Sequence, residues 1–131
     1  MNLIIAQYFD AIEARFLQSF AISSYQILRR EIAGIDGKLR ANLVLVDGSV
    51  AEMFEYVREI AGQIRLLKYS FHWQEQQGRL RRRWDNAPHF PDLPNAPHHI
   101  HEGDGSVVEA KNPPNMLLVI EEFENGIQAP V

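Results

Sequence analysis

Residues 65–84 read RLLKYSFHWQEQQGRLRRRW, and their pattern decides the expected fold. Between Arg65 and Gln74 apolar and polar side chains alternate, which is typical of a β-strand with one buried face. Residues 75–78 are polar and end in glycine, so they predict a loop, and residues 79–84 return as a second strand. The stretch therefore predicts a β-hairpin.

The length of this loop also predicts how the two strands pair. A four-residue loop would bring three residues of each strand onto one face, with Gln74 opposite Arg79, His72 opposite Arg81 and Ser70 opposite Arg83. The other face would carry mainly aromatic rings, namely Tyr69, Phe71, Trp73 and Trp84. We therefore expect one aromatic face and one face on which a histidine lies among arginines.

A proline-rich segment follows the hairpin. Prolines recur every three residues at positions 88, 91, 94 and 97, and proline lacks the amide hydrogen that a helix or a sheet ladder needs. Residues 85–104 are therefore expected to form an irregular loop, and a loop of this length in a compact domain is usually functional. All five histidines of the chain lie between residues 70 and 101.

The segments before the hairpin predict one helix and further strands. Residues 2–19 carry an apolar stripe at helical spacing, formed by Ile5, Phe9, Ile12 and Phe16. Residues 21–35 and 38–46 alternate like strands. A tight turn is expected at Gly34 and Asp36-Gly37, and a second one at Asp47-Gly48. Residues 49–62 fit either a strand or a helix that begins with a capping box at Ser49 and Glu52. The strand is favoured because a two-residue Asp-Gly turn usually joins strands.

The last predicted element is a helix. Asn112 followed by two prolines is typical of a helix start, and Gly126 is expected to end it. The order of elements predicts an α+β fold in a single domain spanning residues 1–131. We expect an antiparallel β-sheet meander of about five strands, with an N-terminal and a C-terminal helix packed on one face.

Composition excludes several classes of protein. A chain of 131 residues without cysteine has no disulfides, no thiolate metal site and no cysteine nucleophile. It has no run of eighteen apolar residues and no signal-peptide pattern at its N-terminus, so a cytoplasmic protein without a membrane partner is expected.

Charge is distributed unevenly along the chain. The net charge is −4, yet residues 65–101 hold six basic against three acidic side chains. A basic patch on an acidic body suggests a nucleic-acid-binding surface. The cations expected to bind nucleic acid are Lys68, Arg79, Arg81 and Arg82.

The His98-His99-x-His101 segment has three interpretations. The favoured one is acid–base cleavage of a phosphodiester without a metal, because histidine can both take and give a proton near neutral pH. His72 would work with His98, His99 or His101, while Arg81 or Arg83 would stabilise the charge on phosphorus.

The other two interpretations need different chemistry. These histidines could bind a metal ion together with Asp85 or Asp92, although no recognised zinc-binding motif is present. Alternatively the histidines are structural, and the loop is a surface for a binding partner. In the catalytic interpretation, Asp85 could instead orient an imidazole ring.

Three motifs in order resemble the TumE-type family of toxins from bacterial toxin–antitoxin modules. They are Tyr69-Ser-Phe-His72-Trp, Arg83-Trp-Asp85-Asn86-Ala-Pro-His89 and Pro97-His98-His99-x-His101. Phe90 stands where a second histidine is common in that family, and Phe71 replaces a usual tyrosine. The catalytic positions that the resemblance implies are His72, Arg83, Asp85, His89, His98, His99 and His101.

The resemblance implies a toxin that is suggested to act as a ribonuclease beside a cognate antitoxin of helix-turn-helix type. We therefore expect an endoribonuclease that cleaves RNA by histidine acid–base catalysis with arginine stabilisation, without a cofactor. A metal-dependent phosphodiesterase or metal-binding module and a non-catalytic binding protein are the alternatives. The two-sided hairpins would also allow a homodimer.

Overall fold

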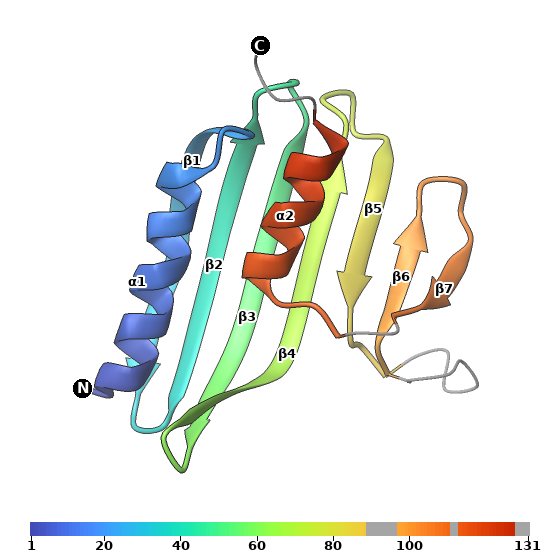
Figure 1. Ribbon diagram of the computed structural model, residues 1–131. Helices are drawn as coiled ribbons and strands as arrows, with labels where there is room; N and C mark the ends of the chain where they lie inside the picture. Colours follow the sequence, from blue (N-terminus) through green and yellow to red (C-terminus); the bar gives the residue numbers. More distant parts are fainter. Residues whose placement is uncertain (89–96, 111–112, 128–131) are drawn as a thin grey trace.

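The computed structural model describes residues 1–88, 97–110 and 113–127, which form an α+β fold. Within these residues one antiparallel sheet has the strand order β1-β2-β3-β4-β5-β6-β7. The elements are α1 (Leu3–Gln18), β1 (Ile22–Ala33), β2 (Asp36–Leu45), β3 (Val50–Ile60), β4 (Gln63–Gln74), β5 (Leu80–Asp85), β6 (His99–Glu102), β7 (Val107–Glu109) and α2 (Met116–Gly126). The predicted meander with two helices on one face is confirmed, with seven strands instead of about five (Figure 1).

Helix α1 forms where the apolar stripe predicted it. The Asn2 side chain accepts a hydrogen bond from the amide of Ile5 at 3.1 Å and so caps the first turn. The buried residues of the helix are Ile5, Ala6, Phe9, Ile12 and Phe16. This stripe packs on the sheet together with the buried face of α2, and the two helices and the sheet share one hydrophobic core.

The first predicted turn forms at Gly34, but Asp36-Gly37 is not part of it. The chain turns at Gly34 and Ile35, where Gly34 has a φ of 58°, and Asp36 and Gly37 already belong to β2. Gly37 is needed for another reason, since a Cβ there would lie 2.6 Å from Cγ2 of Ile5. Its missing side chain therefore lets α1 approach the sheet.

Residues 50–60 form a strand, as the favoured interpretation predicted, and the helical alternative is wrong. Strand β3 pairs with β2 on one side and β4 on the other. Its alternate side chains point toward the helices, and one of these is the fully buried carboxylate of Glu55. Glu55 accepts hydrogen bonds from the Tyr8 hydroxyl of α1 and the Met116 amide of α2, both at 2.6 Å. Burial raises the pKa of Glu55 to about 7, although these two hydrogen bonds oppose the rise.

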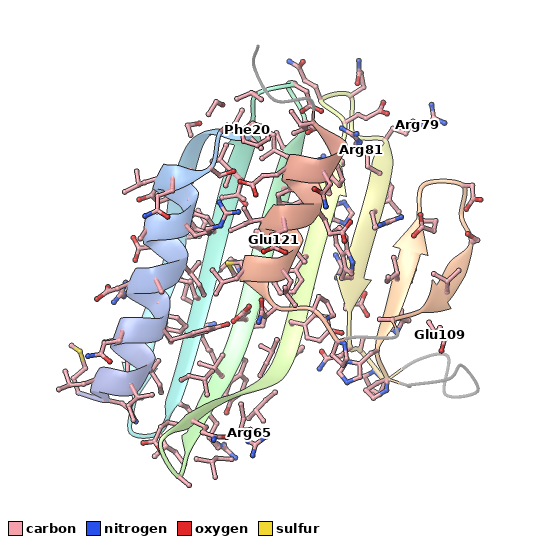
Figure 2. All side chains as sticks on the ribbon, in the orientation of Figure 1. Phe20, Arg65, Arg79, Arg81, Glu109 and Glu121 are labelled. Carbon is pink, nitrogen blue, oxygen red and sulfur yellow. The ribbon has the colours of Figure 1, made fainter. Side chains whose placement is uncertain are left out.

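The hairpin of β4 and β5 exists, but its predicted register is wrong. Gln74 pairs with Leu80 instead of Arg79, and a β-bulge between Trp73 and Gln74 shifts the pairing by one more residue, so that His72 lies opposite Arg83. Arg81 therefore does not share the face of His72. It stacks over the Trp73 ring at 4.1 Å and donates to Asp47 at 2.7 Å, near the end of α2 (Figure 2).

Two further predictions need correction in the second half of the chain. Residues 85–104 are not entirely irregular, because residues 99–102 form β6 and pair with both β5 and β7. The cap of α2 is Asn115, which accepts from the Leu118 amide at 2.9 Å, and residue 112 lies outside the described residues. Gly126 is the last helical residue, as expected.

The fold leaves two different faces on the sheet. Helices α1 and α2 both lie on one face, where the large apolar side chains are buried (Figure 1). We call the opposite side the open face, defined by Gln26, Asn42, Glu52, His72, Arg83 and His101. None of the described helices is long and apolar enough to cross a membrane.

Candidate functional site

Polar side chains form a single row across six neighbouring strands of the open face. Each member lies opposite the next in the sheet register, and the row runs Gln26, Asn42, Glu52, His72, Arg83, His101. Strands lie about 4.8 Å apart, so His72 and His101 stand about 10 Å apart with Arg83 between them. The PHHIH segment therefore returns to the strand face of His72 and Arg83, as the catalytic interpretation requires.

Arg83 connects the members of this site. Its Nη1 lies 3.3 Å from Nδ1 of His72, and its Nε donates to Oδ2 of Asp85 at 2.9 Å. Because a guanidinium can only donate, Nδ1 of His72 accepts and its Nε2 carries the proton. That proton is donated to Oε1 of Gln74 at 3.0 Å. In this arrangement the lone pair on Nδ1 of His72 faces Arg83.

Asp85 is a buried side chain that contacts both His99 and His101. Its Oδ1 lies 2.8 Å from Nε2 of His99, and its Oδ2 lies 3.4 Å from Nε2 of His101. The Asp85 side chain is 5% exposed and that of His99 is 1% exposed, whereas that of His101 is 22% exposed. His101 is therefore accessible from solvent, while His99 is enclosed and contacts Asp85.

The proton positions on His99 follow from its partners. Its Nδ1 lies 2.7 Å from the carbonyl oxygen of Pro97, which only accepts, so Nδ1 carries a proton. Its Nε2 lies 2.8 Å from Oδ1 of Asp85, so the two side chains are in direct contact. The predicted role of Asp85 in orienting an imidazole agrees with this geometry.

His98 lies on the helix side of the sheet and is separated from this group. Its Nδ1 lies 2.8 Å from the Tyr69 hydroxyl, and its ring stacks on the Tyr69 ring. Burial, followed by the nearby His99, lowers the pKa of His98. Burial, followed by the charge of Asp85, raises the pKa of Tyr69. The structure thus brings His72, Arg83, Asp85, His99 and His101 together, but not His98, while His89 lies outside the described residues.

The four predicted nucleic-acid-binding cations are not on one surface. Lys68 is on the open face, opposite Tyr56 of β3. Arg82 points to the helix side, where it pairs with Glu102 and Glu122 and lies over the Trp84 ring. Arg81 is on the helix side as well, and Arg79 is exposed beside the β4–β5 turn (Figure 2). The predicted basic patch is therefore divided between the two faces.

Other cations, which the sequence analysis missed, replace this patch. A hollow of about 960 Å³ on the open face is lined by Arg29, Lys38, Arg40, Lys68, His72, Arg83 and Asp85, among others. Two of its cations cover aromatic rings: Arg40 lies 4.4 Å from the Phe54 ring centroid and Lys38 lies 5.2 Å from that of Tyr56. Alternation could place each residue on a face, but only the register across the five strands β1 to β5 shows that they share this hollow.

Asp85, His99 and His101 also have the composition of a metal site. One donor atom from each lies within 4.8 Å of the other two. Two imidazoles and a carboxylate are common ligands of zinc and of other transition metals. His99 donates its other ring N–H to a backbone carbonyl, as metal-binding histidines usually do.

The fold and site define a small α+β protein with a histidine–arginine–carboxylate group on an open sheet face. A family model described as Toxin TumE matches residues 10–130 of the chain. The chain therefore belongs to the TumE toxin family, and the resemblance seen in the sequence is confirmed. Neither the curated proteins nor the solved structures contain a match. Membership makes the chain the toxin of a toxin–antitoxin module and implies a cognate antitoxin as its partner.

Proposed function

We propose that this toxin is an endoribonuclease whose active site lies on the open face around Arg83. The observation that carries the proposal is the position of Arg83 between His72 and His101, directly opposite both in the sheet register. A cation between two histidines is the arrangement that metal-free phosphodiester cleavage needs, because one ring takes a proton while the other gives one. The adjoining cationic hollow supplies binding for the RNA backbone.

Each member of the row has a role in the proposed reaction. When RNA binds, Arg83 turns its Nη1 from His72 to a phosphate oxygen, which leaves Nδ1 of His72 as a base. His72 accepts the proton of the 2′-hydroxyl, and that oxygen forms a bond to phosphorus. The bond from phosphorus to the 5′-oxygen breaks, and protonated His101 gives that oxygen its proton. The products are a 2′,3′-cyclic phosphate and a 5′-hydroxyl end.

Asp85 supports both positive groups in this scheme. Its carboxylate is 2.9 Å from Arg83 Nε and 3.4 Å from Nε2 of His101, the imidazole that acts as acid. His99 contacts Asp85 through its Nε2, and it is a positioning residue in the proposed reaction. A cytoplasmic location, an antitoxin of helix-turn-helix type and a homodimer are further parts of the proposal.

The test is cleavage of RNA by the purified toxin in the presence of EDTA. We expect cleavage by the wild-type protein and a loss of roughly 100-fold or more for His72→Ala and His101→Ala, since general acid–base catalysis typically contributes that much. His98→Ala is the matched control, because this neighbouring histidine lies on the helix side. Absence of cleavage with and without added metal, together with unaffected growth on expression, would overturn the proposal.

A metal-dependent phosphodiesterase is the second candidate, favoured by the convergence of Asp85, His99 and His101. A divalent ion held by these three side chains would stabilise negative charge on the phosphate. Elemental analysis separates the candidates, because a metal enzyme would retain about one ion per chain. Activity abolished by EDTA and restored by Zn²⁺ or Mn²⁺ would select this candidate over the metal-free one.

A further inference from the structure

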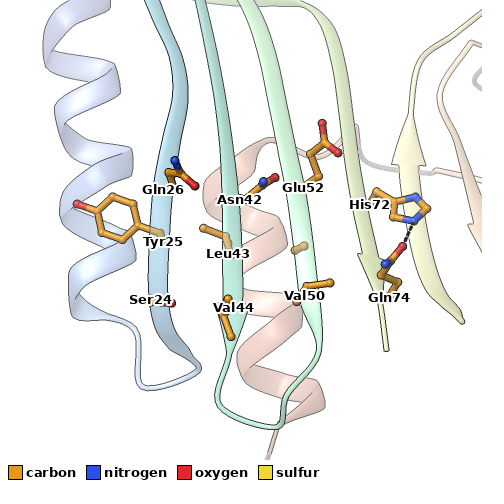
Figure 3. Close-up of a pocket in the computed structure, with 11 residues that line it drawn as sticks. Ser24, Tyr25, Gln26, Asn42, Leu43, Val44, Val50, Glu52, His72 and Gln74 are labelled. Atoms are coloured by element: carbon orange, nitrogen blue, oxygen red, sulfur yellow. Dashed lines mark hydrogen bonds between the residues drawn. The ribbon is translucent and has the colours of Figure 1, made fainter. Parts of the chain in front are cut away.

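A second hollow lies on the open face beside the proposed active site. It measures about 480 Å³ and is formed by strands β1 to β4 (Figure 3). His72, Gln74 and Glu52 line both this hollow and the larger cationic one, so the two adjoin at His72. The proposed reaction uses only the side of His72 that faces Arg83, and it leaves this second hollow without a role.

The lining of the smaller hollow differs in kind from that of the larger. Figure 3 shows the side chains of Gln26, Asn42 and Glu52 following one another toward His72. Val44 and Val50 add apolar surface on one side of this row. Amides and a carboxylate beside apolar surface can read the hydrogen-bonding edge of a planar heterocycle, whereas the cations of the larger hollow suit phosphate.

We propose that this hollow is a nucleobase subsite that binds guanine next to the phosphate to be cleaved. The inference rests on the proposed ribonuclease function and adds a sequence preference to it. Asn42 stands two strands from His72, about 10 Å away by the strand spacing, which is within reach of a nucleotide adjoining that phosphate.

The hydrogen-bonding capacity of the Glu52 side chain determines which base this subsite can bind. Arg40 Nη1 donates to Glu52 Oε1 at 2.6 Å, which holds the side chain as a carboxylate that can only accept. Guanine offers it two adjacent donors, N1–H and the N2 amino group, and its O6 can accept from the amide of Asn42. Uracil offers one donor flanked by two carbonyl oxygens, and adenine presents an unprotonated N1, so both would place an acceptor against the carboxylate.

The same chemistry selects single-stranded RNA. In a duplex, the Watson–Crick edge of guanine is occupied by its partner, and side chains can read that edge only when the base is unpaired. The subsite takes an unpaired guanine, in a loop or a single strand.

Binding is measured with labelled six-nucleotide RNAs that are 2′-O-methylated throughout, so that no cleavage can occur. One RNA contains a single guanine in a uridine background, and the other has adenine at that position. We expect the guanine RNA to bind roughly tenfold or more tightly, the discrimination that one bidentate base contact provides. Glu52→Gln and Asn42→Ala should remove the preference, while Gln7→Ala on the exposed surface of α1 should keep it.

Equal affinity for the two RNAs, absence of binding to either, or a preference that survives in Glu52→Gln would overturn the inference. Thermal unfolding of each variant confirms that the fold is kept. Because these RNAs cannot be cleaved, the outcome is independent of catalysis. Guanine binding without cleavage of ordinary RNA would refute the ribonuclease proposal alone, whereas cleavage with no guanine preference would refute the subsite alone.

Discussion

Replacing Glu55 with glutamine is expected to change how the stability of the toxin depends on pH. Glu55 is buried between α1, α2 and the sheet, and burial raises its pKa to about 7. The folded protein therefore keeps this carboxyl protonated at pH values where the unfolded chain has released the proton. Stability from this group is complete below about pH 4.5 and is lost as the pH rises to about 7.

The size of the effect follows from the two pKa values. A rise of the pKa from its ordinary value of 4.5 to about 7 corresponds to roughly 3 kcal/mol of unfolding free energy. Glutamine has the same shape and stays neutral. Its oxygen can accept from the Met116 amide, and its amino group can donate to the Tyr8 hydroxyl. The variant should match the wild type near pH 5 and exceed its stability by up to roughly 3 kcal/mol at pH 8.

Urea unfolding followed by circular dichroism at pH 5, 6, 7 and 8 measures this difference. The lowered pKa of partly buried His98 contributes in the opposite direction, but it is common to both proteins and cancels in the comparison. Glu121→Gln, at an exposed position of α2, is the control and should show no such trend. A stability difference that is the same at pH 5 and pH 8, or a Glu55→Gln variant less stable at pH 8, would refute the reasoning.

Three further substitutions test other parts of the structure. Gly37→Ala should lower the unfolding free energy by roughly 1–3 kcal/mol, because its Cβ would lie 2.6 Å from Ile5 Cγ2; an unchanged urea midpoint would contradict this packing. Arg83→Lys should keep the fold but reduce RNA cleavage, because a lysine cannot hold Asp85 and a phosphate with one planar fork; unchanged kcat and KM would contradict this role. Asp85→Asn should weaken both cleavage and thermal stability, since it removes the charge that Arg83 and His99 face; a variant equal to wild type in both assays would show that Asp85 is dispensable.

The sequence predicted those parts of the fold that local periodicity encodes. The stripe of Ile5, Phe9, Ile12 and Phe16 was enough to locate α1, and alternation was enough to locate β2 and β4. Strand β6 was missed because it has only four residues and follows a run of prolines. Its stability comes from pairing with β5 and β7, and these contacts are not local in sequence.

The sequence analysis named most residues of the candidate site, but it did not predict how they are arranged in space. The partner of His72 changes from Arg81 to Arg83 because the loop is one residue longer than predicted and a β-bulge follows Trp73. No residue pattern in the hairpin indicates a bulge there. The opposite directions of His98 and His101 follow from alternation once the segment is a strand. The contribution of β1, β2 and β3 to the open face could not be predicted, because it depends on the register of each strand in turn.

The most direct test of the central claim is the chemistry of the RNA ends made by the purified toxin in EDTA. The proposal predicts 2′,3′-cyclic phosphate and 5′-hydroxyl ends, made by the wild type and by His98→Ala. Folded His72→Ala and His101→Ala proteins should produce them roughly 100-fold more slowly or worse. Ends with a 5′-phosphate, or full activity in either of these two variants, would contradict the role assigned to the row of His72, Arg83 and His101.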